Sequence, residues 1–243
     1  MARKKSKEEW KTYGGVFDNY TIENLKKLSS QGYFDEIETS LALGKEANIF
    51  LARTKEEQLI VIKIYRLENC DFNKMYSYIA QDPRYDTLKG SRRRIIFEWT
   101  KREYRNLQIA REVIKVPTPI AFKDNIMLME YIKDEDGPAL QLKDAKLDNP
   151  KRMLDDILDT ITMLYKRGVV HGDLSSFNIL VKNQRPIFID FSQSTVTSSN
   201  QAPKLMIRDL NNIASYFKKQ GIDMDPNETY TVITGKQHPP EDL

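Results

Sequence analysis

The hydrophobic residues of this chain fall into two kinds of pattern, short apolar runs and stripes at helical spacing. Runs rich in Ile, Leu and Met occupy 58–65 and 126–132 and predict buried strands. Residues 94–111 and 150–165 instead repeat their apolar positions every three or four residues, which predicts amphipathic helices. The second helix is expected to begin at Pro150, because proline is favoured at the first position of a helix. The chain therefore mixes α and β elements.

A pair of short strands is predicted in the C-terminal half. The apolar runs 179–181 and 187–189 are separated by the polar segment 182–186, which contains Asn and Pro and is typical of a turn. An antiparallel hairpin brings the residue before its first strand and the residue after its second strand to the same end. These two residues are Asn178 and Asp190.

The residues around this hairpin have the chemistry of phosphoryl transfer. Such a transfer needs a carboxylate to orient the attacking hydroxyl and oxygen ligands for the Mg²⁺ that neutralises the triphosphate. Asp173 precedes Asn178 at the spacing of the kinase catalytic loop, and Asp190 stands where a kinase has Asp-Phe-Gly. Each residue alone is explained by an ordinary turn or strand end. The ordered set predicts an ATP-dependent phosphotransferase, with Asp173 and Asp190 in catalysis and Asn178 and Asp190 on the metal.

A lysine within the first apolar run is a candidate for binding the nucleotide phosphates. Lys63 should have a carboxylate or phosphate partner, because an unpaired charge in such surroundings is costly. Glu103 lies on the same helical stripe as Trp99 and Leu107 and is expected to point inward. We expect Lys63 and Glu103 to form the pair that kinases use to fix the lysine against the α- and β-phosphates. The alternative is that Lys63 lies on an edge strand and Glu103 at the border of the stripe.

The segment 40–50 is a candidate for a loop that covers the phosphates. It has a single glycine, Gly44, where a protein kinase has a glycine-rich loop. Ser40 and Lys45 are able to donate hydrogen bonds to phosphates there. A plain hairpin explains the same residues equally well.

The second apolar run is a candidate for the hinge between two lobes. It turns acidic at Glu130 and leads to Gly137-Pro138. In kinases the hinge backbone binds the edge of adenine. We therefore expect main-chain groups of Glu130 and Ile132 to contact the nucleotide base.

Composition narrows the class of protein. A length of 243 residues with 40% hydrophobic residues suits one two-lobed globular protein, and no apolar run is long enough to span a membrane. The single cysteine, Cys70, excludes an internal disulfide and fits a reducing compartment, and the basic start at residues 1–5 lacks the apolar segment of a signal peptide. We expect a cytoplasmic protein.

The charge distribution is compatible with a local contact with nucleic acid. A net charge of +3 is too small for a chain that binds nucleic acid over its whole surface. The basic N-terminus, Arg92–Arg94 and the pair Lys101-Arg102 with Arg105 can together form a phosphate-binding surface. Such charge runs are also typical of solvated helix faces.

Several motifs together resemble the RIO family of atypical serine/threonine protein kinases. In chain order they are Gly44-Lys45-Glu46-Ala47, Lys63-Ile64-Tyr65, Asp82-Pro83-Arg84-Tyr85, residues 99–107, Val116-Pro117-Thr118-Pro119, His171-Gly172-Asp173-Leu174-Ser175, Ile189-Asp190-Phe191-Ser192-Gln193 and Arg208-Asp209-Leu210. The resemblance spans about residues 38–220. It is to the type-1 branch in its compact archaeal form, because the stretch before Leu41 is too short for the winged-helix domain of the type-2 branch.

The resemblance implies an α+β, two-lobed, protein-kinase-like fold. Residues 1–37 would form a basic N-terminal extension with a helical segment, 38–132 an N-lobe with the ATP loop, a flexible insertion at about 69–94 and helix C, and 133–243 a C-lobe. Nothing after Asp190 resembles an activation segment, so the C-lobe is expected to be trimmed and to lack the peptide-binding helices. Gly172 stands where many type-1 members have Ala, and we expect this difference to be small.

The resemblance also implies roles for the residues and for the protein. Asp173 would be the catalytic aspartate, Asn178 and Asp190 the metal ligands, and Lys63 the phosphate ligand. ATP with Mg²⁺, or Mn²⁺, would be the cofactors. Family members act in late maturation of the small ribosomal subunit, and some use ATP hydrolysis, with phosphorylation of the aspartate equivalent to Asp190, as a release switch. The expected partners are therefore rRNA and proteins of the pre-ribosomal small subunit.

Two other classes of function remain open from the sequence. Small-molecule kinases of the aminoglycoside or choline phosphotransferase type carry the same His-Gly-Asp and Ile-Asp-Phe motifs, although they usually have a larger helical substrate lobe. A nucleotide-gated module that binds RNA or protein would use ATP only as a structural ligand. The intact set of Lys63, Glu103, Asp173, Asn178 and Asp190 favours an active kinase or ATPase.

Overall fold

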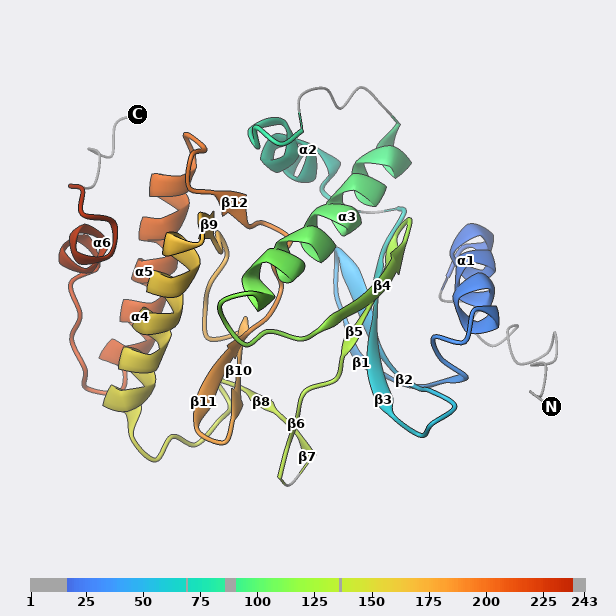
Figure 1. Ribbon diagram of the computed structural model, residues 1–243, viewed down its shortest axis with the longest axis horizontal. Coiled ribbons are helices and arrows are strands. Elements are labelled where there is room, and N and C mark those ends of the chain that lie inside the picture. The colour runs from blue at the N-terminus through green and yellow to red at the C-terminus, as the bar shows by residue number, and fades with distance from the viewer. Residues whose placement is uncertain (1–16, 69, 86–90, 136, 238–243) are drawn as a thin grey trace. The chain divides into compact units, whose positions relative to one another are not determined.

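The computed structural model describes residues 17–68, 70–85, 91–135 and 137–237, and the chain divides into two compact units (Figure 1). The first unit comprises 1–75, 90–101 and 119–131, and the second comprises 76–89, 102–118 and 132–243. The basic start at residues 1–5 and part of the expected insertion, Asn69 and 86–90, lie outside the described residues. Within the described ranges, no helix is both long and apolar enough to cross a bilayer.

The first unit is built on a five-stranded antiparallel sheet in the order β1-β2-β3-β5-β4. Its strands are β1 (Glu36–Leu43), β2 (Ala47–Arg53), β3 (Leu59–Tyr65), β4 (Pro119–Lys123) and β5 (Ile126–Glu130). The two apolar runs predicted as buried strands are β3 and β5, and they pair with each other at the middle of the sheet. The core of this unit combines apolar side chains of β2, β3 and β5 with those of helix α1 (Asn19–Ser30).

Helix α1 is fixed to the turn between β4 and β5. Asp124, in the left-handed region at φ 52°, accepts a hydrogen bond from Asn24 Nδ2 at 3.0 Å. Asn125, fully buried, donates from Nδ2 to Thr21 Oγ1 and to the Tyr65 carbonyl, both at 2.9 Å. One amide therefore joins α1, the end of β3 and this turn.

Two helices connect β3 to β4. Helix α2 spans Phe72–Ala80 and α3 spans Arg92–Arg111, so the predicted helix begins at Arg92 rather than at Arg94. The predicted apolar stripe of α3 is buried at Ile96, Trp99, Leu107 and Ala110. The guanidinium of Arg92 lies 5.1 Å from the ring centre of Phe72, so its charge packs on an aromatic face at the start of α3.

The second unit combines three further helices, and the C-terminal parts of α2 and α3, with short antiparallel strands. Its helices after α3 are α4 (Pro150–Lys166), α5 (Ala202–Lys218) and α6 (Pro226–Thr234). Its strands are β6 (Lys133–Asp134), β7 (Gly137–Pro138), β8 (Leu140–Gln141), β9 (Val169–Val170), β10 (Ile179–Lys182), β11 (Arg185–Phe188) and β12 (Thr195–Val196). Helix α4 begins at Pro150 as predicted, and the side chain of Asn149 caps it by accepting the N–H of Arg152 at 2.9 Å.

The predicted hairpin is β10 and β11, with a tighter turn than the sequence suggested. Ile179 pairs with Phe188 and Lys182 with Arg185, so only Asn183 and Gln184 form the turn, at φ 49° and 56°. Positive φ at both central residues is the conformation that joins twisted strands in a two-residue hairpin. Pro186 lies within β11 rather than in the turn, which an edge strand tolerates.

The described residues after Asp190 form a short connection rather than a long activation segment. Strand β12 pairs with β9, and residues 197–201 then lead directly into α5. Helices α5 and α6 complete the unit up to Thr234. The expectation of a trimmed C-lobe is confirmed for this part of the chain.

Candidate active site

A buried carboxylate in α5 holds the loop that carries Asp173. Asp209 is 3% exposed and accepts the backbone N–H of Gly172 at 2.7 Å and that of Leu174 at 2.8 Å. Burial raises the pKa of Asp209 to about 7, while these two hydrogen bonds favour its ionised form. The two N–H groups flank Asp173, so Asp209 fixes the backbone on both sides of the candidate catalytic residue.

His171, two residues before Asp173, also holds this loop in place. Its Nε2 lies 3.0 Å from the carbonyl oxygen of Ile189, and its Nδ1 accepts the N–H of Asp173 at 3.3 Å. Because a carbonyl only accepts, the proton of the neutral ring belongs on Nε2. Burial lowers the pKa of His171 to about 4, so the ring is neutral at physiological pH. His171 thereby joins the backbone of Asp173 to the residue that precedes Asp190.

Asn178 is oriented by Asp173. Its Nδ2 donates to the Asp173 carbonyl at 2.8 Å and lies 3.4 Å from Asp173 Oδ2. This places the amide nitrogen toward Asp173 and turns Oδ1 the other way. An amide oxygen presented in this manner is a suitable ligand for a hard cation.

Asp190 is brought next to Asn178 by the hairpin. The N–H of Ile189 donates to the Asn178 carbonyl at 3.0 Å, which extends the β10–β11 pairing by one step. Asp190 itself has φ 61°, an uncommon conformation for a residue other than glycine, and its Oδ1 accepts the Ser192 hydroxyl at 2.7 Å. The structure thus gathers Asp173, Asn178 and Asp190 at one end of the hairpin.

Lys63 and Glu103 are both buried, and they lie in different units. Lys63 is 5% exposed on β3, the central strand of its sheet, so the alternative of an edge-strand lysine is wrong. Its Nζ lies 5.1 Å from the ring centre of Tyr65. Glu103 is 1% exposed on α3, so it does not lie at the border of the stripe. Their pairing stays a prediction.

The candidate phosphate loop is the turn between β1 and β2. The N–H of Gly44 donates to the Ala47 carbonyl at 3.0 Å, and a Cβ at Gly44 would come within 2.7 Å of that oxygen. Glycine is therefore required at this turn. Ser40 and Lys45 are exposed on either side of it.

The candidate hinge residues have different backbone environments. Glu130 is the last residue of β5 and pairs with Ile60. The carbonyl of Ile132 accepts the N–H of Ala139 at 3.1 Å, in the second unit. The Ile132 carbonyl is therefore already hydrogen-bonded within the fold. The sequence alone did not distinguish it from the N–H of Ile132 as a contact for adenine.

Arg208 also lies near Asp173, although the sequence motifs gave it no functional role. Its Nη2 lies 3.9 Å from Asp173 Oδ1 and donates to the Gly172 carbonyl and, at 3.2 Å, to Gln193 Oε1. Arg208 and Asp209 were recognised only as part of the family-like Arg-Asp-Leu motif. Their position in the sequence gave no sign of which loop they contact.

The expectation that Gly172 is a minor difference is wrong for this backbone. Gly172 has φ 79°, and a Cβ there would lie 2.8 Å from the carbonyl oxygen of Gln193. Any side chain must therefore shift the loop or the backbone of Gln193. The loop conformation seen here depends on glycine.

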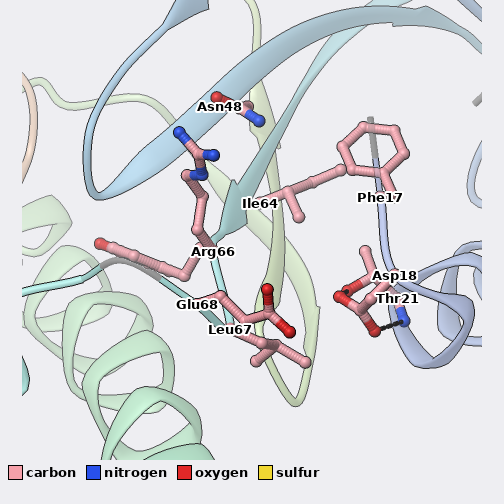
Figure 2. A pocket seen from close by; sticks show the side chains of 9 residues that line it. Phe17, Asp18, Thr21, Asn48, Ile64, Arg66, Leu67 and Glu68 are labelled. Atoms are coloured by element: carbon pink, nitrogen blue, oxygen red, sulfur yellow. Dashed lines mark hydrogen bonds between the residues drawn. The ribbon is translucent and has the colours of Figure 1, made fainter. Parts of the chain in front are cut away.

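A small pocket of the first unit lies where α1 begins, beside the end of β3 (Figure 2). Its volume is about 100 Å³, and of the candidate phosphate loop 40–50 only Asn48 lines it. Asp18 accepts the N–H of Thr21 at 3.0 Å there and caps α1. Drug-sized and cofactor ligands usually occupy roughly 300–1,000 Å³, so this pocket is not a nucleotide site.

Comparison with solved structures identifies the class of fold. A Rio2 kinase from Chaetomium thermophilum matches with a TM-score of 0.72 and 22% identity, over 89% of this chain and 67% of that one. The same kinase in an ADP/Mg²⁺-phosphoaspartate complex matches with a TM-score of 0.71 and 21% identity, over 94% and 68% of the two chains. The fold is protein-kinase-like, as expected.

Comparison of sequences then identifies the family. The model of the RIO domain matches residues 48–229. The RIO-type serine/threonine-protein kinase Rio1 of Methanocaldococcus jannaschii is 39% identical, over 97% of this chain and 81% of its own length, and Rio1 of Haloferax volcanii is 30% identical over the same shares. The chain belongs to the RIO family, in its type-1 branch, and is an atypical serine/threonine protein kinase.

We predict that Gly172→Ala damages the catalytic loop. The substitution combines a positive φ with a backbone clash, and we expect a loss of roughly 2–4 kcal/mol in the free energy of unfolding, with a fall in kinase activity. Gly221→Ala is the matched control, because Gly221 has φ 76° but open space around the added Cβ, so only about 1 kcal/mol is expected. Equal losses for the two variants would show that the clash with Gln193 has no effect. Denaturant unfolding and phosphoryl-transfer assays measure both.

We also predict that His171 makes stability depend on pH. The unfolded histidine binds a proton below pH 6.5 and the folded one only near pH 4, so its stabilising contribution is lost as pH falls through this window. The stability difference between wild type and His171→Gln should shrink by roughly 3 kcal/mol from pH 7 to pH 4.

Wild type must be compared with His171→Gln because Asp209 changes the stability in the opposite direction as pH falls. Its raised pKa makes its contribution fall as pH rises from about 4 to 7, and this effect is present in both proteins. A stability difference that stays constant with pH, in denaturant titrations of both proteins, would contradict a depressed pKa at His171.

Proposed function

We propose that this kinase transfers the γ-phosphoryl group of ATP in a Mg²⁺-dependent reaction at the end of the β10–β11 hairpin. The observation that carries the proposal is the grouping of Asp173, Asn178 and Asp190 in one unit, held by backbone hydrogen bonds. Asp173 orients the acceptor and takes its proton. Asn178 Oδ1 and the Asp190 carboxylate hold the metal, which supplies positive charge against the triphosphate when bound.

The metal site that we propose needs the nucleotide to complete it. The described residues contain no group of three or more His, Cys, Asp and Glu able to hold a metal ion. One amide and one carboxylate fit Mg²⁺, which usually binds one or two protein ligands together with phosphate oxygens and waters. Mg²⁺ should therefore bind tightly only with ATP. Mn²⁺, which prefers the same oxygen ligands, should replace it.

Residues of both units supply the remaining nucleotide contacts in this proposal. Lys63 binds the α- and β-phosphates, and Glu103 fixes it in that position; both side chains are buried. Ser40 and Lys45 contact the phosphates from the turn at Gly44. At the hinge, the Glu130 backbone and the N–H of Ile132 bind adenine, since the Ile132 carbonyl is already bonded to Ala139. Residues 38–132 would then act as the N-lobe and 133–243 as the C-lobe.

We propose further that ATP is also hydrolysed, and that Asp190 is a phosphate acceptor. The related Rio2 kinase was crystallised as an ADP/Mg²⁺-phosphoaspartate complex, which supports an aspartate as acceptor in this family. The trimmed connection between Asp190 and α5 offers no extended peptide-binding segment in the described residues, which favours self-phosphorylation or a bulky partner over a free peptide. The role is proposed to be maturation of the small ribosomal subunit in the cytoplasm.

We predict distinct effects for the two carboxylates. Asp173→Ala should leave ATP binding intact and reduce phosphoryl transfer by about 100- to 10,000-fold, because it removes the acceptor-orienting group. Asp190→Ala should abolish Mg²⁺-dependent turnover, because it removes a metal ligand and the acceptor. Asp155→Ala, on the exposed face of α4, is the control and should leave turnover unchanged.

The measurement uses ATP labelled on the γ-phosphate, with Mg²⁺ and no added substrate, and follows protein-bound label and free phosphate separately. Label or phosphate that is lost in Asp173→Ala supports the proposal. Unchanged turnover in Asp173→Ala would remove it from the catalytic role. ATP binding without either product would favour a nucleotide-gated binding module instead.

A further inference from the structure

A β-turn follows Asp190 directly and fixes its direction. The N–H of Ser194 donates to the Phe191 carbonyl at 3.2 Å and closes the turn. Ser192, inside the turn, donates its hydroxyl to Asp190 Oδ1 at 2.7 Å. Ser194 Oγ donates to the His171 carbonyl at 2.8 Å. Any shift of this turn must therefore move the Asp190 carboxylate relative to the catalytic loop.

One buried amide holds both ends of this turn. Asn106 of α3 is fully buried, and its Nδ2 donates to the Phe191 carbonyl and to the Ser194 carbonyl, each at 3.0 Å. The two protons of a primary amide match two carbonyl acceptors. Phe191 and Ser194 are themselves fully buried, so water cannot easily replace this donor.

Arg84 determines which way the Asn106 amide faces. Its Nη1 donates to Asn106 Oδ1 at 3.0 Å. A guanidinium has only donors, so the amide oxygen must face Arg84 and the amide nitrogen must face the turn. In the reverse orientation the amide nitrogen would face the guanidinium of Arg84, donor against donor. The amide oxygen would then face the carbonyls of Phe191 and Ser194, acceptor against acceptor.

Arg84 is held in turn by Asp82, from the same Asp-Pro-Arg-Tyr motif. Arg84 Nε donates to Asp82 Oδ1 at 2.9 Å and Nη2 to Asp82 Oδ2 at 2.6 Å, a two-bond pair. Arg102, with a fully buried side chain, adds a bond from Nη2 to the Ser194 carbonyl at 2.8 Å and lies 3.4 Å from Asp82 Oδ2. Burial lowers the pKa of Arg102 to about 10, so it is still a cation at neutral pH.

We propose that Asn106 is a positioning residue for the metal-binding Asp190, and that the Asp82–Arg84 pair keeps the Asn106 amide in the orientation this requires. The inference rests on the proposed function, which assigns Asp190 to Mg²⁺. Residues that orient metal ligands without touching the metal typically change metal affinity about 10- to 100-fold when they are replaced. The segment before residue 86 is thereby coupled to the metal site through three side chains.

The test is the Mg²⁺ dependence of phosphoryl transfer at saturating ATP. Asn106→Asp keeps an acceptor for Arg84 and loses the Nδ2 donor, so it should raise the Mg²⁺ concentration for half-maximal activity about 10- to 100-fold. Arg84→Met leaves Asn106 in place but allows its amide to flip. This variant should raise the Mg²⁺ concentration for half-maximal activity roughly three- to tenfold. Tyr216→Phe is the matched control, because it removes a different hydrogen bond to a backbone carbonyl, that of Leu142, in the same unit.

A merely structural role for Asn106 would lower the unfolding temperature without changing the Mg²⁺ dependence, and that result in a folded Asn106→Asp protein would overturn the proposal. If Asn106→Asp does not fold, the same comparison of unfolding temperature and Mg²⁺ dependence is made on Arg84→Met. Asn178→Ala separates this inference from the proposed function, because it removes a proposed metal ligand and leaves the acceptor Asp190 in place. If Asn178→Ala shifts the Mg²⁺ dependence and the Asn106 and Arg84 variants do not, only the positioning role is wrong. If Asn178→Ala has no effect either, the metal assignment itself fails.

Discussion

The candidate active site depends first on a buried carboxylate that accepts two backbone N–H groups. Asp209 bonds to Gly172 and Leu174 and so fixes the backbone on both sides of Asp173. Removing a carboxylate from water is unfavourable, and here two charge-assisted hydrogen bonds offset much of that cost. The loop in turn requires a glycine at 172, because any Cβ would meet the Gln193 carbonyl.

The remaining parts of the site are tied to this loop through backbone groups rather than through long side chains. His171 bonds to the Ile189 carbonyl, and Ile189 bonds to Asn178. Asn106 holds the turn after Asp190. Such a network positions Asp173, Asn178 and Asp190 before any ligand arrives, which is the condition for electrostatic catalysis with little reorganisation. The proposed phosphoryl transfer relies mainly on this preorganisation.

Much of this arrangement could be predicted from the sequence. Strands β3 and β5, helices α3 and α4 and the β10–β11 hairpin follow from local periodicity and turn chemistry, which act over short stretches of chain. The position of Pro186 within β11 was missed, because the tolerance of an edge strand for proline depends on the sheet order. The roles of Asp209, Asn106 and the Asp82–Arg84 pair were also missed. Their contacts join segments far apart in the chain, and no local pattern encodes them.

In the proposed reaction, Asn178 and Asp190 together hold a divalent cation beside Asp173. The most direct measurement is a crystal structure with a non-hydrolysable ATP analogue and Mn²⁺, in which anomalous scattering locates the metal. We expect a Mn²⁺ ion within about 2.5 Å of both Asn178 Oδ1 and an Asp190 carboxylate oxygen, with phosphate oxygens completing the ligands. A nucleotide-bound metal that contacts neither side chain would contradict it.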